Sequence, residues 1–216
     1  FAIAISQASD GIDANSPTIT AVSITDAAMA VGDTVTATIT VSGAAGEALT
    51  LTSGTIGGFT LGSLTKVSDT SYTATFDVTE GGTDVAAGSD IPVSLALADP
   101  AGNASNTFTT AISQASDGID ANSPTITAVS IADAAMAVGA TVTATITVSG
   151  ATGETLTLTS GTIGGFTLGS LTKVDDTTYT ATFDVTEGGT DVAAGSDIPV
   201  SLALADPAGN ASNTFT

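Results

Sequence analysis

Apolar residues and hydroxyl-bearing residues alternate along this chain with a period of two. Between Thr34 and Ser42 every second residue is Val, Ala or Ile, and the residues between them are Thr or Ser. A period of two puts alternate side chains on opposite faces of a strand, so this stretch is predicted to be a strand with one buried face. No stretch of useful length has the helical period, and the chain is predicted to be all-β.

The chain also repeats itself with an offset of 107 residues. Residues 1–107 and 108–214 differ at only eight positions. A period of this length corresponds to a whole domain rather than to one turn of a solenoid. We therefore expect two copies of one domain.

Seven strands are predicted in the first copy, separated by turn residues such as those of Asp99-Pro100-Ala101-Gly102-Asn103. They span residues 17–25, 34–43, 47–52, 59–67, 71–78, 90–98 and 105–113. The first strand changes parity between Ala21 and Val22, which indicates a bulge or a switch between sheets. Seven short strands in about 100 residues are typical of an Ig-like sandwich. The predicted fold is two tandem Ig-like seven-stranded β-sandwich domains joined end to end.

The expected domain boundaries follow from the polar stretch that links the two copies. Residues 1–13 are interpreted as the last strand and linker of a preceding repeat, residues 14–119 as one sandwich, and residues 120–216 as a second sandwich that lacks its complete last strand. Two outcomes are predicted for that incomplete edge. It frays, or Phe1–Ile5 of a neighbouring molecule fills it by strand addition.

Side chains that carry most enzyme chemistry are scarce. The chain has no His, Cys or Trp, and its only basic residues are Lys66 and Lys173. General acid–base catalysis, nucleophilic catalysis and phosphate clamps draw mainly on the missing types, so we expect no enzyme and no small-molecule substrate. A net charge of −20 argues against nucleic acid and anionic membrane surfaces as partners. No apolar run approaches the ~18 residues that membrane insertion requires.

Carboxylates are abundant and gather where strands end. If the strands alternate up and down, loops from one end of the first sandwich, the linker and loops from one end of the second sandwich converge. The predicted ligands there are Asp26, Glu80, Asp84, Asp117, Asp120, Asn122, Asp206 and Asn210. Their equivalents in the repeat complete the candidate set with Asp10, Asp13, Asp99, Asn103, Glu187 and Asp191.

Clustered carboxylates repel one another unless a cation bridges them. Ca²⁺ takes six to eight oxygen ligands and accepts carboxylate, amide and backbone oxygens alike. The sequence therefore predicts Ca²⁺ at the junction of neighbouring repeats. The alternative is that these residues are solvated or act as turn formers and caps.

Asp-Pro-Ala-Gly-Asn turns, Asp-Gly-Ile-Asp linkers and the Ala- and Thr-rich, Lys-poor composition resemble the extender repeats of giant bacterial RTX-type adhesins, including biofilm and ice-binding adhesins. The resemblance implies export by a type I system, an extracellular position at the bacterial cell surface, and Ca²⁺ at module junctions. It also implies cell adhesion as the function of the whole protein.

Three classes of function are compared on this basis. A structural extender gains length from every identical copy, so near-identity favours a Ca²⁺-rigidified spacer that projects a distal binding domain. A glycan- or ice-binding sandwich is the alternative, but its aromatic residues fall mostly at inward positions, and a single row of Thr is common on any sandwich. An enzyme has only paired acids such as Asp175 and Asp176 to support it, and the first of these is Ser68 in the other copy.

Overall fold

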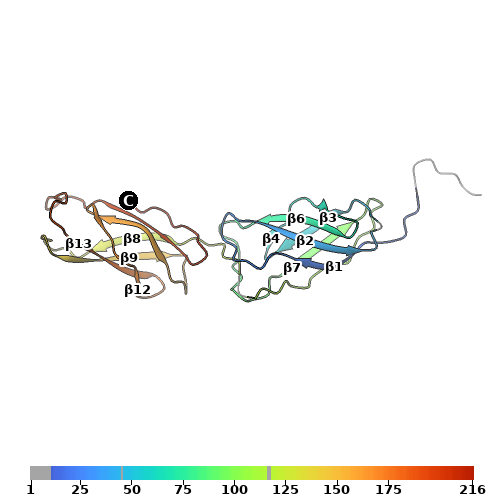
Figure 1. Cartoon of the computed structure of the whole chain (residues 1–216), viewed down its shortest axis with the longest axis horizontal. Coiled ribbons are helices and arrows are strands. Elements are labelled where there is room, and N and C mark those ends of the chain that lie inside the picture. Colours follow the sequence, from blue (N-terminus) through green and yellow to red (C-terminus); the bar gives the residue numbers. More distant parts are fainter. Residues whose placement is uncertain (1–10, 45, 116–117) are drawn as a thin grey trace, which may run out of the picture. The chain divides into compact units, whose positions relative to one another are not determined.

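The computed structural model describes residues 11–44, 46–115 and 118–216, and within these ranges it contains strands and no helix (Figure 1). The first repeat holds β1 (Thr18–Ser23), β2 (Thr34–Ser42), β3 (Thr50–Ile56), β4 (Phe59–Thr60), β5 (Thr65–Lys66), β6 (Ser71–Asp77) and β7 (Val93–Ala98). The second holds β8 (Thr125–Ile131), β9 (Thr141–Ser149), β10 (Thr157–Ile163), β11 (Phe166–Thr167), β12 (Thr172–Lys173), β13 (Thr178–Asp184) and β14 (Val200–Ala205). The expected strand addition by Phe1–Ile5 and the candidate ligands Asp10 and Asp117 lie outside the described residues.

Each repeat forms one four-stranded and one three-stranded antiparallel sheet. The strand orders are β1-β2-β6-β5 and β4-β3-β7 in the first repeat, and β8-β9-β13-β12 and β11-β10-β14 in the second. All strand pairs are antiparallel. The prediction of an all-β, Ig-like sandwich is confirmed.

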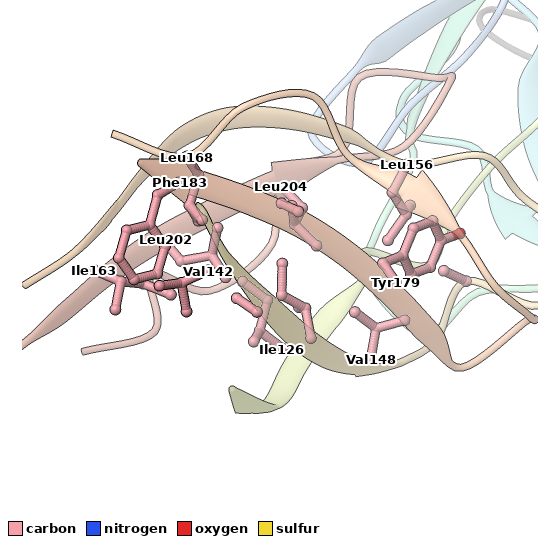
Figure 2. Close-up of a cluster of buried hydrophobic side chains, with 14 residues drawn as sticks. Ile126, Val142, Val148, Leu156, Ile163, Leu168, Tyr179, Phe183, Leu202 and Leu204 are labelled. Carbon is pink, nitrogen blue, oxygen red and sulfur yellow. The ribbon is translucent and has the colours of Figure 1, made fainter. Parts of the chain in front are cut away.

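Apolar side chains from both sheets fill the space between them. In the second repeat the core draws on β8, β9 and β13 of one sheet and on β10 and β14 of the other (Figure 2). It includes Ile146 and Leu202, both 0 % exposed. Phe166 on β11 stacks on Phe183 on β13 with ring centroids 6.0 Å apart. The inward face of each alternating strand therefore builds one core per repeat.

The parity change in the first strand is a bulge. Ile19 pairs with Val41, but Ala21 pairs with Thr40, so one extra residue stands in β1. That extra residue turns the following side chains to the opposite face. Of the two alternatives that the sequence left open, the bulge is confirmed.

The prediction of one strand over residues 59–67 was wrong, because the chain changes sheets there. The backbone nitrogen of Leu61 donates to Gly54 on β3, whereas that of Gly62 donates to Thr75 on β6. The stretch is therefore β4 in one sheet and β5 in the other. The strand expected at 47–52 lies instead at Thr50–Ile56, where a register shift between Leu51 and Ser53 hides the period of two.

The strand expected at 105–113 is not continuous. Ile112 and Phe108 make isolated bridges with Ile91 and Leu95. Toward β1 this segment forms its hydrogen bond through a side chain instead of through its backbone. Oδ1 of Asn106 accepts a hydrogen bond of 2.9 Å from the backbone nitrogen of Ile19. The amide side chain of Asn106 thus gives the backbone N–H of Ile19 a hydrogen-bond partner at the edge of β1, where no neighbouring strand in the described part of the chain pairs with it.

The described residues fall into two compact units. Unit 1 comprises those up to Ala27, together with Asp33–Val78 and Val85–Ile119. Unit 2 comprises Asp120–Thr216 and two loops of the first repeat, Ala28–Gly32 and Thr79–Asp84. Repeat and compact unit are therefore not the same set of residues. The described chain has no helix of the length and apolarity that a membrane crossing requires.

Candidate metal centre

Three carboxylates meet in each unit, and the two groups are equivalent in the repeat. Unit 2 brings together Asp120, Glu154 and Asp206, and unit 1 brings together Asp13, Glu47 and Asp99. In each group one oxygen from every residue lies within 4.8 Å of the others. We call these groups the unit 2 triad and the unit 1 triad. The first and third members of each triad were candidate ligands from the sequence.

Asp206 is held by the turn that follows β14. Its Oδ1 accepts hydrogen bonds of 2.8 Å from the backbone nitrogens of both Gly209 and Asn210. Gly209 has a φ of +101°, a conformation that few other residues adopt without strain. The turn thus fixes one oxygen of Asp206 and leaves the other, Oδ2, buried without a hydrogen-bond partner among the described residues.

Asp120 belongs to the linker between the two repeats. Its backbone nitrogen donates to the carbonyl of Met29 at 2.9 Å, and its Oδ1 accepts from the backbone nitrogen of Asn122 at 3.3 Å. The side-chain nitrogen of Asn210 lies 3.4 Å from the carbonyl oxygen of Asp120. The Asp-Pro-Ala-Gly-Asn turn and the linker are therefore joined within unit 2 before any ion is considered.

Glu154 was not among the predicted ligands. It lies in the loop between β9 and β10, and the hydroxyl of Tyr179 donates to its carbonyl at 2.8 Å. Tyr179 is 0 % exposed and lies at the same end of the core as Leu156 (Figure 2). A buried tyrosine thus anchors the loop that carries the third carboxylate. Glu154 could have been found from the sequence, because up-and-down alternation of the strands places its loop at the same end of the sandwich as Asp206.

Two carboxylate oxygens of the unit 2 triad are buried without a hydrogen-bond partner among the described residues. They are Oδ2 of Asp206 and Oε2 of Glu154. Asp206 as a whole is only 4 % exposed. Buried polar atoms normally have partners, because leaving one unsatisfied costs about 1–3 kcal/mol and more when the group is charged. The triad therefore offers buried carboxylate oxygens that could hold a cation.

The two triads differ in the role of one asparagine. In unit 1 the side-chain nitrogen of Asn103 donates to Oδ2 of Asp99 at 2.9 Å. In unit 2 Oδ1 of Asn210 accepts from the backbone nitrogen of Val31 at 2.7 Å, and its nitrogen lies 3.4 Å from the carbonyl oxygen of Asp120, as that of Asn103 lies 3.4 Å from the carbonyl oxygen of Asp13. The oxygen that Asn103 satisfies in unit 1 is consequently free in unit 2.

Burial, together with the neighbouring carboxylates, raises the pKa of Glu154 in unit 2. Burial is the largest cause that raises the pKa of Glu154, to about 7. The charges of Asp120, Asp206 and Asp84 add to this effect, and the charge of Lys173 opposes it. A carboxyl with such a pKa is partly protonated near neutral pH in the absence of a cation, because its neighbours disfavour a further negative charge.

The linker carboxylate follows the same trend. Burial is the first cause that raises the pKa of Asp120, and the charge of Asp206 contributes, although the backbone nitrogen of Asn122 works in the opposite direction. Lys173 makes its ion pair with Asp176 at 2.8 Å rather than within the triad. Lys173 therefore does not neutralise the triad by a direct ion pair, and the repulsion between its carboxylates remains in the folded protein.

Unit 1 shows a weaker form of this pattern. The pKa of Glu47 is raised, first by burial and then by Asp13 and Asp99. Burial would also raise the pKa of Asp99, but hydrogen bonds from Asn103, Gly102 and Ala101 outweigh it and leave the pKa below its ordinary value.

Other predicted ligands are engaged in hydrogen bonds with the linker. Oδ1 of Asp84 accepts from the backbone nitrogen of Ala121 and the side chain of Asn122, both at 2.8 Å. Glu80 accepts from the backbone nitrogen and the hydroxyl of Ser123 at 2.9 and 2.7 Å. These contacts lie within unit 2 and seat the segment that carries Asp120.

Three predicted ligands lie away from the triads. Oδ2 of Asp26 accepts from the backbone nitrogen of Ala115 at 3.2 Å. Glu187 and Asp191 are exposed and line a hollow at the other end of the second repeat. Within unit 2 the structure does not bring Glu187 and Asp191 together with Asp120 or Asp206.

The geometry of the triads suits a hard divalent cation. Two oxygens that are each ~2.4 Å from one Ca²⁺ are at most ~4.8 Å apart, and the triad oxygens meet that limit. Carboxylate oxygens are the ligands that Ca²⁺ favours, whereas zinc sites usually include His or Cys. Three converging carboxylates and the carbonyl oxygens of the adjoining turn supply the required donor type.

No protein-family model and no curated protein matches the chain. Among solved structures, the chain is similar to the adhesin FdeC of Escherichia coli, with a TM-score of 0.52 and 20% identity over 92% of this chain and 62% of that chain. It also aligns with an I-band fragment of titin at a TM-score of 0.44 and 11% identity, over 91% of this chain and 64% of that chain. The chain thus spans less than two thirds of either structure, and the likeness to FdeC supports the Ig-like fold.

Proposed function

We propose that this chain is a structural extender of a cell-surface adhesin, in which bound Ca²⁺ stiffens the repeats. The observation that carries the proposal is the unit 2 triad, where two buried carboxylate oxygens have no hydrogen-bond partner within the described part of the chain and a third carboxylate comes from the linker. An ion bound there would tie the linker residue Asp120 to the loops that carry Glu154 and Asp206. The linker would then lose backbone freedom at the position where the two repeats join.

A spacer role is supported by what the repeats share. The two copies keep the core, the triad and the Asp-Pro-Ala-Gly-Asn turn, and they differ at only eight positions. The longest strand of each repeat has nine residues and spans ~30 Å at ~3.3 Å per residue. Each further copy would add a similar length without a new binding site. FdeC, whose fold is similar, is described as an adhesin.

The proposal also covers where the protein is located and which class of adhesin it belongs to. Surface display, type I export and membership of the RTX-type adhesins rest on the resemblance of the linkers and turns. External Ca²⁺ would then be available to the triads. The proposal includes neither an enzymatic activity nor a nucleic-acid partner, since the chain has two basic residues and no His or Cys.

Thermal unfolding with and without a chelator, combined with small-angle X-ray scattering, tests this function. We expect Ca²⁺ to raise the melting temperature and to increase the maximum dimension of the chain. Mg²⁺ at equal concentration is the control, because it demands a tighter octahedral geometry and holds its waters more strongly. Equal melting temperatures and equal dimensions in Ca²⁺ and in chelator would contradict the proposal.

A further inference from the structure

One side chain closes the outer edge of β1. The sheet order β1-β2-β6-β5 ends at β1, so within the described residues no strand pairs with its outer side. The backbone nitrogen of Ile19 donates to Oδ1 of Asn106 at 2.9 Å, and Nδ2 of Asn106 donates to the carbonyl of Ile19 at 3.4 Å. One amide group thus bonds both backbone groups of Ile19, as a neighbouring strand would.

The segment that carries Asn106 belongs to the opposite sheet. The backbone nitrogen of Ser105 donates to the carbonyl of Leu97 on β7 at 2.8 Å, and Oγ of Ser105 accepts from the backbone nitrogen of Leu97 at 2.9 Å. Phe108 and Leu95 exchange backbone hydrogen bonds of 2.8 and 3.1 Å. The backbone on both sides of Asn106 is therefore fixed to one sheet while its side chain bonds the edge of the other.

The second repeat has the same arrangement. The backbone nitrogen of Ile126 on β8 donates to Oδ1 of Asn213 at 2.7 Å, and Nδ2 of Asn213 donates to the carbonyl of Ile126 at 3.2 Å. Ile19 and Asn106 both lie in unit 1, and Ile126 and Asn213 both lie in unit 2. Each contact therefore belongs to a single folded unit.

The edge strand has few other protections against pairing with another chain. Natural edges are protected by charged side chains, prolines and bulges. β1 has the sequence Thr-Ile-Thr-Ala-Val-Ser, which contains no charge and is rich in β-branched residues. Pro17 lacks an N–H just before the strand, and the bulge follows Ile19. Between these two features, the backbone of Ile19 is covered by Asn106.

The uncovered edge would match a second copy of itself. Ile19 pairs with Val41, and Val22 pairs with Ile39, two residues further along β2. Because backbone groups alternate in direction along an antiparallel strand, Ile19 and Val22 direct theirs to the same side, away from β2. Two such edges in antiparallel orientation would supply donors and acceptors to each other. A contact between two copies of one edge is isologous and closes at a dimer.

We infer that the side chains of Asn106 and Asn213 each block a latent strand-addition site, at Ile19 and at Ile126, and that the partner they exclude is the same edge of a second copy of this chain. Near-identity of the repeats makes such a block necessary, because every copy offers the same uncharged edge. The block uses neutral side-chain and backbone groups. It does not involve the triads and does not depend on a bound ion.

Sedimentation equilibrium in chelator tests the block. Salt at ~0.15 M screens much of the repulsion that a net charge of −20 produces. Wild type should remain a single chain up to ~1 mM, a concentration at which weak contacts become visible. Asn106→Ala opens one edge, so its average mass should rise toward that of two chains and stop there. The variant that combines Asn106→Ala with Asn213→Ala opens two edges and should exceed two chains.

Two further variants assign the association to the edge. Thr18→Lys, added to Asn106→Ala, places a charge beside Ile19 and should return the mass to that of one chain, because like charges at a shared edge repel. Thr34→Val is the matched control for lost stability. It removes the hydrogen bond of 2.6 Å to Asp77 on β6 and leaves the edge of β1 closed, so this variant should remain a single chain.

Hydrogen exchange at the Ile19 amide provides a measurement on the wild-type chain itself. We expect this amide to exchange ~10-fold more slowly in wild type than in dilute Asn106→Ala, as the loss of a typical hydrogen bond implies. Circular dichroism shows whether each variant is folded. A folded Asn106→Ala that stays a single chain at ~1 mM would overturn the inference. So would association that Thr18→Lys does not reduce, or a wild-type Ile19 amide that exchanges as fast as an exposed one.

Discussion

The hydroxyl of Tyr179 donates a hydrogen bond of 2.8 Å to the carbonyl of Glu154, and Tyr72 makes the equivalent bond to Glu47. One buried aromatic ring therefore links the core of each repeat to its carboxylate triad. The core positions the ring, and the ring positions the loop that carries the glutamate. The proposed binding of Ca²⁺ would therefore be coupled to the stability of the core through this bond.

Substitution of Tyr179 by Phe keeps the ring and removes the bond. We expect a loss of about 1 kcal/mol, the typical net contribution of such a hydrogen bond. For a domain of this size that corresponds to a fall of about 4–8 °C in melting temperature. Ca²⁺ affinity should also fall, because the glutamate is less well fixed. Tyr72→Phe is the matched control, which should affect the sites of unit 1 and leave those of unit 2 unchanged. Calorimetric melting and Ca²⁺ titration check both parts, and an unaltered affinity in Tyr179→Phe would contradict the coupling.

The raised pKa of Glu154 predicts how stability depends on pH without Ca²⁺. Its pKa is about 7 in the folded protein and close to 4.5 when unfolded, so between these values the folded state binds more protons. Stability in chelator should therefore fall as the pH rises from about 4.5 to about 7 and then level off. Solvent screening at this partly exposed group limits the change to roughly 1–2 kcal/mol.

Glu154→Gln should flatten that profile, because the amide does not titrate. Glu187→Gln, at an exposed carboxyl, should leave the profile as in wild type. Melting temperatures in chelator at intervals from pH 4 to pH 8 provide the comparison. A wild-type stability that rises over this window would show that the carboxylates of the triad do not repel as the structure indicates.

The alternation of residues was sufficient to predict the sandwich, and it left the bulge in β1 as one of two explanations of the parity change. It could not assign residues 59–67, because a period of two shows which side chains face inward and not which sheet a strand joins. The pattern is interrupted at Gly62, and the backbone nitrogens of the neighbours Leu61 and Gly62 pair with different sheets. The last strand was overestimated for a related reason, since the side chain of Asn106 takes the place of backbone pairing.

The candidate site could be predicted in part. Asp120 and Asp206 were recognisable because a linker and an Asp-Pro-Ala-Gly-Asn turn carry them. Glu154 was missed because one acidic residue in a glycine-containing loop resembles a solvated turn, and its anchor Tyr179 lies 25 residues further along the chain. The distinction between triad carboxylates and those that seat the linker, such as Asp84, depends on hydrogen bonds that only the structure provides.

A buried side chain that is shortened in one repeat should destabilise the core of that repeat and leave the core of the other unchanged. Leu202 is 0 % exposed and lies within the core of the second repeat (Figure 2). Leu202→Ala should cost about 2–5 kcal/mol, as for other buried leucines. Leu95→Ala, the equivalent change, should destabilise the first repeat by a similar amount. Hydrogen exchange resolved by repeat measures both losses. A large loss of protection in the first repeat from Leu202→Ala alone would contradict one core per repeat.

Isothermal titration of Ca²⁺ into the chelator-treated chain tests the central claim most directly, with wild type compared to Glu47→Gln, Glu154→Gln and the double variant. The triads predict two ions for wild type, one for each single variant and none at either triad for the double variant, while Glu187→Gln binds as wild type does. Binding that is unchanged in the double variant, or absent from wild type, would contradict the claim that these carboxylates form Ca²⁺ sites.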